Sequence, residues 1–280
     1  MSRRSYANLA GVEVGDGFPV RLVGALNVSP ESFYAGSVRR GSRAIERLAV
    51  RMVAEGADIL DVGAMSTAPY RRGAISEAEE RRRLTAAVRV LRAAVSIPLS
   101  VDTQRGGVAA AALEAGADII NDVSGLSDPA MGAVARQAAG VVLVANQRHP
   151  SGRAPLMMIG GLLRQCMARA RRARIARGRI VLDPGIGFFR QAARPWDEVD
   201  CLVVRNLARL RTLGQPLLVG VSRKSFIGKL TGRGDPGERL AGSLAAAAVA
   251  VFNGAALVRT HDVAATVDAV RVAEAIRTIG

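Results

Sequence analysis

The stretch EGADILD at residues 55–61 decides the fold, because the chain repeats it almost unchanged as EAGADIIND at residues 114–122. In both copies a glycine, Gly56 or Gly116, stands where a helix would end, since glycine adopts the left-handed backbone of a helix C-terminus at little cost. An apolar run follows each glycine almost at once. The repetition indicates a chain built from successive helix-to-strand units.

Eight short apolar runs recur along the chain, with helical periodicity between them. They cover residues 21–26, 58–62, 98–101, 118–121, 141–144, 180–182, 217–221 and 256–258. Runs that are apolar throughout are typical of parallel strands covered on both faces. Eight strand–helix units in about 250 residues match the size of a (β/α)8 barrel. We therefore predict an α/β fold, a (β/α)8 TIM barrel, as a single domain over residues 1–280, with residues 1–20 as an N-terminal extension before the first barrel strand.

An open doubly wound sheet is the alternative to the barrel. A glycine-rich phosphate loop would favour it, but no GxGxxG follows the first predicted strand and no GxxxxGK[ST] occurs in the chain.

The net charge of +15 comes almost entirely from arginine, and Lys224 and Lys229 are the only lysines. Such a charge suggests an acidic partner. Aromatic residues make up only 4% of the chain, however, and the arginines are spread through the helical segments. We therefore predict a phosphorylated small molecule as the partner and no nucleic acid, and we expect the densest cluster, residues 169–179, to form an exposed helix face.

Nothing in the chain predicts insertion into or transport across a membrane. No apolar run reaches the roughly 18 residues of a transmembrane helix, and the N-terminus lacks the apolar segment of a secretory signal. Cys166 and Cys201 lie far apart without metal-binding spacing, which favours free thiols and a cytoplasmic location. We expect no membrane partner.

Polar side chains follow all eight predicted strands, where a barrel collects its catalytic residues. These residues are Asn27, Ser66 and Thr67, Asp102 and Thr103, Asn121 and Asp122, Asn146 and Gln147, Asp183, Arg223 to Ser225, and Arg259 to Asp262. A single strand-end aspartate often only caps the next helix. Eight polar exits at one barrel mouth, however, should converge on a common space.

The chemistry of that space divides into two parts. Carboxylates, an amide and an ammonium suit a planar heterocycle such as a pterin or a purine, whose edge pairs with a carboxylate in two places. This part comprises Asp102, Asn121, Asp183 and Lys224. The other part suits phosphate oxygens and comprises Asn27, Arg259 and His261. The Asn27 oxygen is also a suitable ligand for Mg²⁺ held together with phosphate oxygens and waters. A heterocycle joined to a pyrophosphate is the predicted ligand.

Seven segments of the chain resemble, in order, the dihydropteroate synthase family of pterin-binding barrels. They are LNVSPESF at 26–33, GADILDVG at 56–63, SVDT at 100–103, GADIINDVSG at 116–125, LDPGIGF at 182–188, SRKSFIG at 222–228 and RTHDV at 259–263. The SRKS and RTHD phrases point to the synthases rather than to the related pterin methyltransferases.

The resemblance implies a reaction in folate biosynthesis, in which 4-aminobenzoate displaces pyrophosphate from the methylene carbon of a dihydropterin. Its residues would act in three groups. Asp102, Asn121, Asp183 and Lys224 would hold the pterin; Asn27 with Mg²⁺, Arg259 and His261 would stabilise the pyrophosphate; Thr67, Phe188 and Ser225 would line the aminobenzoate site. The catalytic residues would be Asp102, Asp183, Lys224, Arg259 and His261. The resemblance also implies a homodimer formed through the last helices.

Two departures from the family pattern leave other functions open. Where the family has Glu-Ser-Thr-Arg-Pro-Gly, residues 65–70 read MSTAPY, so that Ala68 replaces an arginine. Where the family has Met-His-Met, residues 145–147 read ANQ. The alternatives are a synthase of a methanopterin-type pathway that uses a different arylamine, a pterin methyltransferase, and a non-catalytic pterin-binding paralogue.

Overall fold

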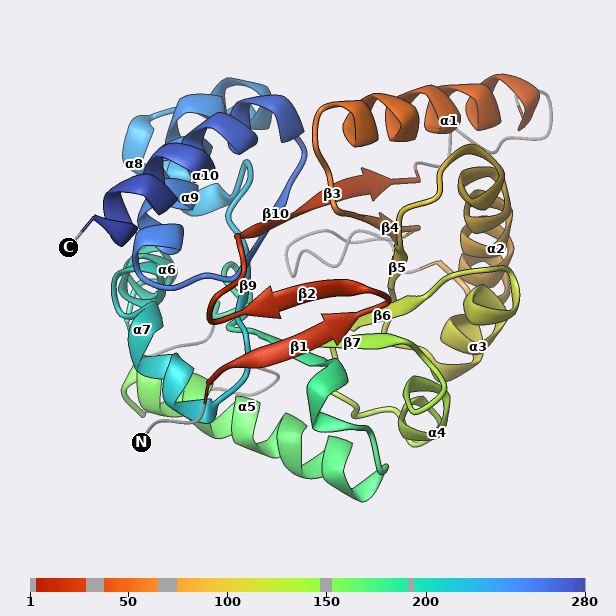
Figure 1. Ribbon diagram of the computed structural model, residues 1–280, viewed down its shortest axis with the longest axis horizontal. Coiled ribbons are helices and arrows are strands. Elements are labelled where there is room, and N and C mark those ends of the chain that lie inside the picture. Colours follow the sequence, from red (N-terminus) through yellow and green to blue (C-terminus); the bar gives the residue numbers. More distant parts are fainter. Residues whose placement is uncertain (1–3, 29–37, 65–74, 147–152, 191–193, 280) are drawn as a thin grey trace.

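Eight parallel strands curve into a barrel surrounded by helices (Figure 1). The structure is a computed structural model that describes residues 4–28, 38–64, 75–146, 153–190 and 194–279. The barrel strands are β3 (Arg21–Asn27), β4 (Ile59–Gly63), β5 (Leu99–Asp102), β6 (Ile119–Asp122), β7 (Gly140–Val144), β8 (Ile180–Asp183), β9 (Leu218–Gly220) and β10 (Leu257–Thr260). Their hydrogen-bonded order is β8-β7-β6-β5-β4-β3-β10-β9, and a parallel bridge between Leu182 and Leu217 joins the two ends. The predicted (β/α)8 barrel is thus confirmed.

Helices follow the barrel strands in turn and cover their outer face (Figure 1). The α-helices are α1 (Val38–Ala54), α2 (Glu77–Ala94), α3 (Gly106–Glu114), α4 (Met131–Ala135), α5 (Pro155–Arg172), α6 (Trp196–Arg205), α7 (Leu207–Leu210), α8 (Ser225–Thr231), α9 (Leu240–Phe252) and α10 (Val263–Thr278). Short 3₁₀ turns are η2 (Arg177–Arg179), η3 (Arg211–Leu213) and η4 (Pro236–Arg239). The outward side chains of the strands and the inner faces of these helices form the larger hydrophobic core.

The repeated phrase ends a helix and starts a strand in both places. Gly56 and Gly116 have φ of 104° and 109°, the left-handed conformation of a helix C-terminus. The aspartate two residues later then ties neighbouring strands together. The Asp58 carboxylate accepts from the Leu22 amide at 2.7 Å, and the Asp118 carboxylate accepts from the Leu99 amide at 2.9 Å.

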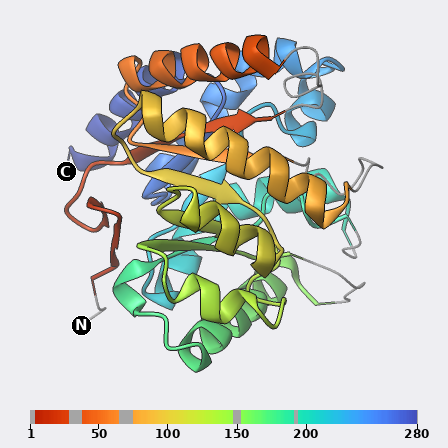
Figure 2. The same cartoon turned by 90° about the vertical axis from the view of Figure 1, so that its right-hand side faces the viewer.

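The extension before the barrel forms a β-hairpin that the sequence did not predict. Strands β1 (Tyr6–Leu9) and β2 (Val12–Gly15) pair antiparallel and lie across the amino-terminal end of the barrel (Figure 1). Figure 2 shows the hairpin at one edge of the molecule, with the arrow of β3 pointing away from it. Ala7, Leu9 and Val14 are buried there against inward side chains from seven of the eight barrel strands. The hairpin therefore closes the barrel at the end opposite the strand exits.

Inward residues change from apolar to polar along the strands. In β4 the inward side chain at the lower end is Ile59, and Asp61 follows two residues later; in β6 the same step leads from Ile119 to Asn121. Because strand side chains alternate between faces, this change gives the barrel an apolar lower layer and a polar upper one.

The arginine cluster at residues 169–179 is not one exposed helix face as predicted. Helix α5 ends at Arg172, and Arg174 has a left-handed backbone with φ of 59°. Arg169 is turned inward and donates to the Gly125 carbonyl at 3.0 Å. Within the described ranges, no helix is long and apolar enough to cross a membrane. Cys166 and Cys201 are free thiols.

Candidate active site

The strand exits bring the predicted carboxylates and amide together at the upper end of the barrel. Asp102 ends β5 and Asn121 lies inside β6, directly opposite it in the sheet register. Asp102 is 8% exposed and Asn121 is 6% exposed. Asp102 Oδ1 and Asn121 Oδ1 are both buried, and neither accepts a hydrogen bond from a described residue. Because such orphaned acceptors are costly to bury, they mark the place where a ligand would donate.

A carboxylate that was not among the predicted site residues links this pair to Arg259. Asp61 in β4 is 1% exposed, and its Oδ2 accepts from Arg259 Nε at 2.6 Å and from Asn121 Nδ2 at 3.2 Å. Its Oδ1 accepts from Ser100 Oγ at 2.6 Å. The alternation in residues 59–63 carried the signal, since it puts Asp61 on the same face as Ile59.

Arg259 lies between two carboxylates. Its Nη2 is 3.6 Å from Asp102 Oδ2, beyond the close pair with Asp61. Burial, and next the negative charge of Asp61, raise the pKa of Asp102 to about 7, although Arg259 and Lys224 oppose the shift. Arg259, which was predicted as a phosphate ligand, therefore lies beside a carboxylate of the heterocycle part of the predicted site.

Lys224 follows β9 and is the residue before α8. Burial lowers the pKa of Lys224, against the attraction of Asp183. Burial also raises the pKa of Asp183 to about 6, although Asp183 Oδ1 accepts from the Gly185 amide at 2.7 Å. The Lys224 ammonium lies 5.3 Å from the centre of the Phe188 ring. A Cβ at Gly187 would lie only 3.3 Å from Lys224 Nζ, so a larger residue there would crowd the ammonium.

The two residues before Lys224 bond to the segment that follows β10. Arg223 has a left-handed backbone with φ of 57°, which is strained for a residue with a side chain. Its guanidinium makes two bonds to the Asp262 carboxylate, at 2.9 Å from Nε and 2.5 Å from Nη2. Arg223 is therefore paired with the RTHD segment and is not a free phosphate ligand. Ser222 Oγ lies 3.0 Å from His261 Nδ1.

His261 and Asn27 form the remaining part of the site. The other ring nitrogen of His261, Nε2, lies 3.4 Å from Asn27 Nδ2. Burial, and next the positive charges of Arg259 and Arg223, lower the pKa of His261 to about 4. The imidazole is therefore neutral at pH 7 and can offer a hydrogen bond but no charge. With its nitrogen facing His261, Asn27 has its side-chain oxygen available for another partner.

The remaining predicted residues divide into those outside the described ranges and those that the structure describes. Thr67, Ala68 and Gln147 lie outside the described residues. Ser225 begins α8 next to Lys224, and Phe188 lies beside the Lys224 ammonium as described above. Asn146 is already bonded, since its Nδ2 donates to the Val123 carbonyl at 3.1 Å.

The described side chains of the site could hold Mg²⁺ only together with oxygens from a ligand and from water. Among the described residues, no three His, Cys, Asp or Glu side chains are close enough to hold a metal ion together. A single amide oxygen such as that of Asn27 fits the usual manner of Mg²⁺ binding, in which phosphate oxygens and waters supply most ligands.

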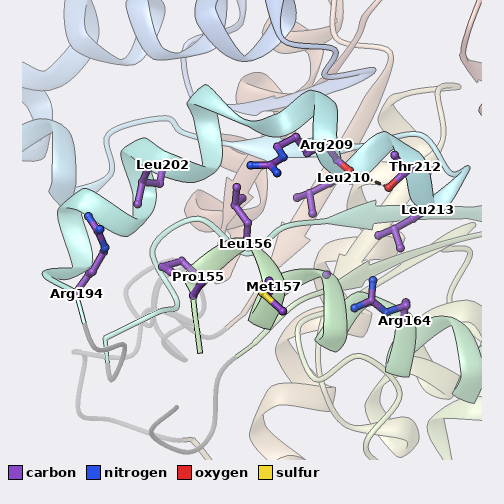
Figure 3. A pocket seen from close by; sticks show the side chains of 12 residues that line it. Pro155, Leu156, Met157, Arg164, Arg194, Leu202, Arg209, Leu210, Thr212 and Leu213 are labelled. Carbon is purple, nitrogen blue, oxygen red and sulfur yellow. Dashed lines mark hydrogen bonds between the residues drawn. The ribbon is translucent and has the colours of Figure 1, made fainter. Parts of the chain in front are cut away.

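A separate groove lies on the outer surface between α5 and the α6–η3 segment (Figure 3). Its volume is about 570 Å³, and leucines with Arg164, Arg194 and Arg209 line it. It contains none of the predicted site residues, so the candidate active site is the barrel mouth.

Known proteins share both the sequence and this architecture. A family model described as pterin binding enzyme matches residues 23–261. The dihydropteroate synthase of Synechocystis sp. is 40% identical over 266 residues, which cover 91% of this chain and 89% of that protein. The Escherichia coli K12 enzyme is 37% identical and covers 91% of this chain and 90% of its own length.

Solved structures of dihydropteroate synthases superpose on this chain over nearly its whole length. Xanthomonas albilineans dihydropteroate synthase with 4-aminobenzoic acid superposes with a TM-score of 0.87 at 37% identity, over 100% of both chains. The same enzyme in complex with 7,8-dihydropteroate gives a TM-score of 0.83 at 34% identity, over 98% of this chain and 99% of that one. The chain therefore belongs to the pterin-binding enzymes and, among them, to the dihydropteroate synthase family.

Proposed function

We propose that this chain is a dihydropteroate synthase. It condenses 6-hydroxymethyl-7,8-dihydropterin pyrophosphate with 4-aminobenzoate and releases 7,8-dihydropteroate and pyrophosphate, a step of folate biosynthesis. The observation that carries the proposal is the pair of buried acceptors without a described donor, Asp102 Oδ1 and Asn121 Oδ1. A pterin has N–H donors along its edge, and these would satisfy both oxygens.

The ring would lie between the Asp102–Asn121 pair and Lys224. Asp183 would accept from the aminopyrimidinone edge, where a carboxylate pairs with two neighbouring N–H groups. The Lys224 ammonium would donate to a ring acceptor. Because Asp102 and Asp183 have raised pKa values of about 7 and about 6, their ionised forms gain the most from a ligand that supplies N–H donors.

The chemical step is a displacement at the pterin methylene carbon. The bond from that carbon to the pyrophosphate oxygen breaks first, and both electrons leave with pyrophosphate. The aniline nitrogen then attacks the cationic methylene and loses a proton. Asp183 would offset the positive charge on the ring, Arg259 would donate to the developing charge on the leaving oxygens, and His261 would orient Asn27 beside them through Nε2. No protein nucleophile is required.

Asn27 would hold Mg²⁺ through its side-chain oxygen. The fit rests on the orientation of Asn27, whose nitrogen faces His261 Nε2. When bound together with the pyrophosphate, Mg²⁺ would neutralise charge on the leaving group.

The second substrate would lie beside Lys224. Phe188 would supply an apolar surface for the ring of 4-aminobenzoate, and Ser225 and Thr67 would donate to its carboxylate. The bond from Asn146 Nδ2 to the Val123 carbonyl supports an ordinary synthase, because it commits part of this amide to the protein rather than to the ligand.

The functional unit in this proposal is a cytoplasmic homodimer. Val249 and Phe252 on α9 are 48% and 55% exposed, and Val272 and Ile276 on α10 are 60% and 57% exposed. Each pair is spaced to share one face of its helix, and the two helices pack against each other (Figure 1). Glutamate at both Val272 and Ile276 should convert a dimer to a monomer in analytical ultracentrifugation; an unchanged mass would reject this interface.

One assay tests the activity. The purified protein receives the pterin pyrophosphate, Mg²⁺ and 4-aminobenzoate, and pyrophosphate release is followed. We expect turnover that a sulfonamide inhibits by competing with 4-aminobenzoate. Tight pterin binding without turnover on 4-aminobenzoate would reject the proposal, and other arylamines would then be tried.

A further inference from the structure

We propose that Asp61 is a positioning residue that orients both Asn121 and Arg259 toward the substrate, an inference that rests on the proposed function. Asp61 is 1% exposed, so that little of its surface remains for a ligand. Its carboxylate receives three side-chain donors from three strands: Ser100 on β5, Asn121 on β6 and Arg259 on β10. One group thereby fixes residues that come from opposite parts of the chain.

The bond to Asn121 decides which end of the amide faces the pocket. Asn121 Nδ2 donates to Asp61 Oδ2, so Oδ1 and the second N–H of Nδ2 remain for a ligand. Without a carboxylate beneath it, the amide could rotate by 180° and exchange its oxygen and nitrogen. A site built to pair with particular ligand groups loses most of its discrimination when a buried partner is mismatched.

Because Arg259 bonds to Asp61, its guanidinium does not pair closely with the second carboxylate, that of Asp102. Asp61 takes Arg259 Nε at 2.6 Å, and Nη2 stays 3.6 Å from Asp102. If Asp61 were neutral, the guanidinium would be free to close on Asp102 and to pair with it in a bidentate manner. Asp102 would then lose the acceptor that it offers to the ligand. Asp61 thus keeps Asp102 available to the ligand.

A purely structural ion pair is the competing explanation, and the chain contains a more exposed example, in which the Asp118 side chain is 33% exposed. Asp118 pairs with Arg92 at 2.5 Å and accepts from the Leu99 amide at 2.9 Å, in the same strand-linking manner but without a site residue. A structural role predicts that Asp61→Asn and Asp118→Asn both lower only the melting temperature. A positioning role predicts that only Asp61→Asn changes ligand binding.

The experiment compares the wild type with both variants in melting temperature, in the Kd values for the free pterin alcohol and for its pyrophosphate, and in the Michaelis constant for the arylamine. For Asp61→Asn we expect the pterin Kd to rise at least about 10-fold and the pyrophosphate Kd to rise further, since two oriented contacts are lost. The Michaelis constant for the arylamine should stay within about 2-fold, because no described contact joins Asp61 to that site. Asp118→Asn should bind pterin within about 2-fold of the wild type.

Two further measurements keep the test decisive. In an Asn121→Ala background the effect of Asp61→Asn on the pterin Kd should be smaller than in the wild type, and the remainder should come from Arg259, since residues acting through one another are not additive. If Asp61→Asn does not fold, Asp61→Glu retains the charge opposite Arg259 but displaces the carboxylate by one methylene, and should still weaken pterin binding about 5-fold or more. Normal pterin binding by a folded Asp61 variant, or full additivity with Asn121→Ala, would overturn the inference. Failure of the wild type to bind pterin would instead reject the proposed function.

Discussion

The lower end of the barrel and its upper end are built by the same eight strands but bury opposite chemistry. Below, the inward side chains are valine, leucine and isoleucine, and the β1–β2 hairpin covers them. Above, within one or two residues along the strands, the inward side chains are Asp61, Ser100, Asn121 and Arg259. Apolar burial stabilises the fold at one end, whereas the proposed function assigns the buried charge at the other end to ligand binding. Changes below should therefore alter stability alone, and changes above should alter binding.

The largest effect is expected from Lys224→Ala, which should weaken pterin binding by roughly 1,000-fold, the scale of breaking a buried charge interaction. The variant should remain folded, because the Lys224 ammonium makes no hydrogen bond or ion pair with any other described residue and the backbone bonds of Lys224 are kept. Isothermal titration calorimetry with 6-hydroxymethylpterin measures the loss. Lys229→Ala is the matched control, since Lys229 pairs with Asp197 at 2.7 Å away from the mouth. Unchanged affinity in Lys224→Ala would reject our assignment of the pocket.

At the lower end the corresponding change is Leu9→Ala. Leu9 is 1% exposed and packs in the apolar layer under the barrel. Truncation of such a buried leucine should lower the free energy of unfolding by about 3 kcal/mol. Urea denaturation measures this loss, and the pterin Kd is measured at a temperature where the variant is still folded. A change of more than about 3-fold in that Kd would contradict the separation of the two ends.

The different predictability of the two ends has a physical cause. The eight strands were predicted to within a residue or two of their bounds because glycine ends the helices and apolar runs follow them. The hairpin was missed because its two-residue turn, Ala10 and Gly11, has positive φ at both positions, and alanine at such a position is not a turn signal. Its alternation, which buries Ala7 and Leu9, was nevertheless present in the sequence.

The site was predictable where a residue ends or follows a predicted apolar run, and not where it lies inside one. Asp102, Asp183 and Lys224 stand at strand exits, so the barrel topology alone brought them together. Asp61 lies inside a strand that was interpreted as uniformly apolar, and only the inward direction of its side chain reveals its role. The pairing of Arg223 with Asp262 was likewise beyond the sequence, because those residues are 39 positions apart.

A smaller effect is expected from Asp102→Asn, and it concerns stability as well as binding. The pKa of Asp102 is about 7 in the folded protein, against an ordinary value of 3.8, so the folded state binds this proton more tightly than the unfolded state. Ionised Asp102 therefore destabilises the fold increasingly as the pH rises from about 4 through about 7. At pH 8.5 the variant should be more stable than the wild type by at least about 1 kcal/mol, whereas at pH 4.5 the two should be nearly equal.

Urea denaturation at both pH values checks this result, and pterin affinity should fall in the same variant. Asp183 and His261 titrate in both proteins, so their contributions cancel when the free energy of unfolding of the wild type is subtracted from that of the variant. Equal stability differences at pH 4.5 and pH 8.5 would mean that Asp102 is not desolvated. The upper end would then not carry the cost of buried charge that distinguishes it from the lower end.

The smallest effect is expected from Asn146→Ala, although Asn146 follows a barrel strand as Asp102 does. Its Nδ2 already donates to the Val123 carbonyl, whereas Asn121 Oδ1 has no described partner. A polar group that is satisfied within the protein has little to gain from a ligand. We therefore expect the pterin Kd to change less than about 3-fold in Asn146→Ala and at least about 10-fold in Asn121→Ala, as measured by titration calorimetry. Equal losses of pterin affinity in the two variants would show that position at the barrel mouth matters more than an unsatisfied hydrogen-bond acceptor. The two ends of the barrel would then differ in binding because of where their residues lie, and not because of unsatisfied polar groups.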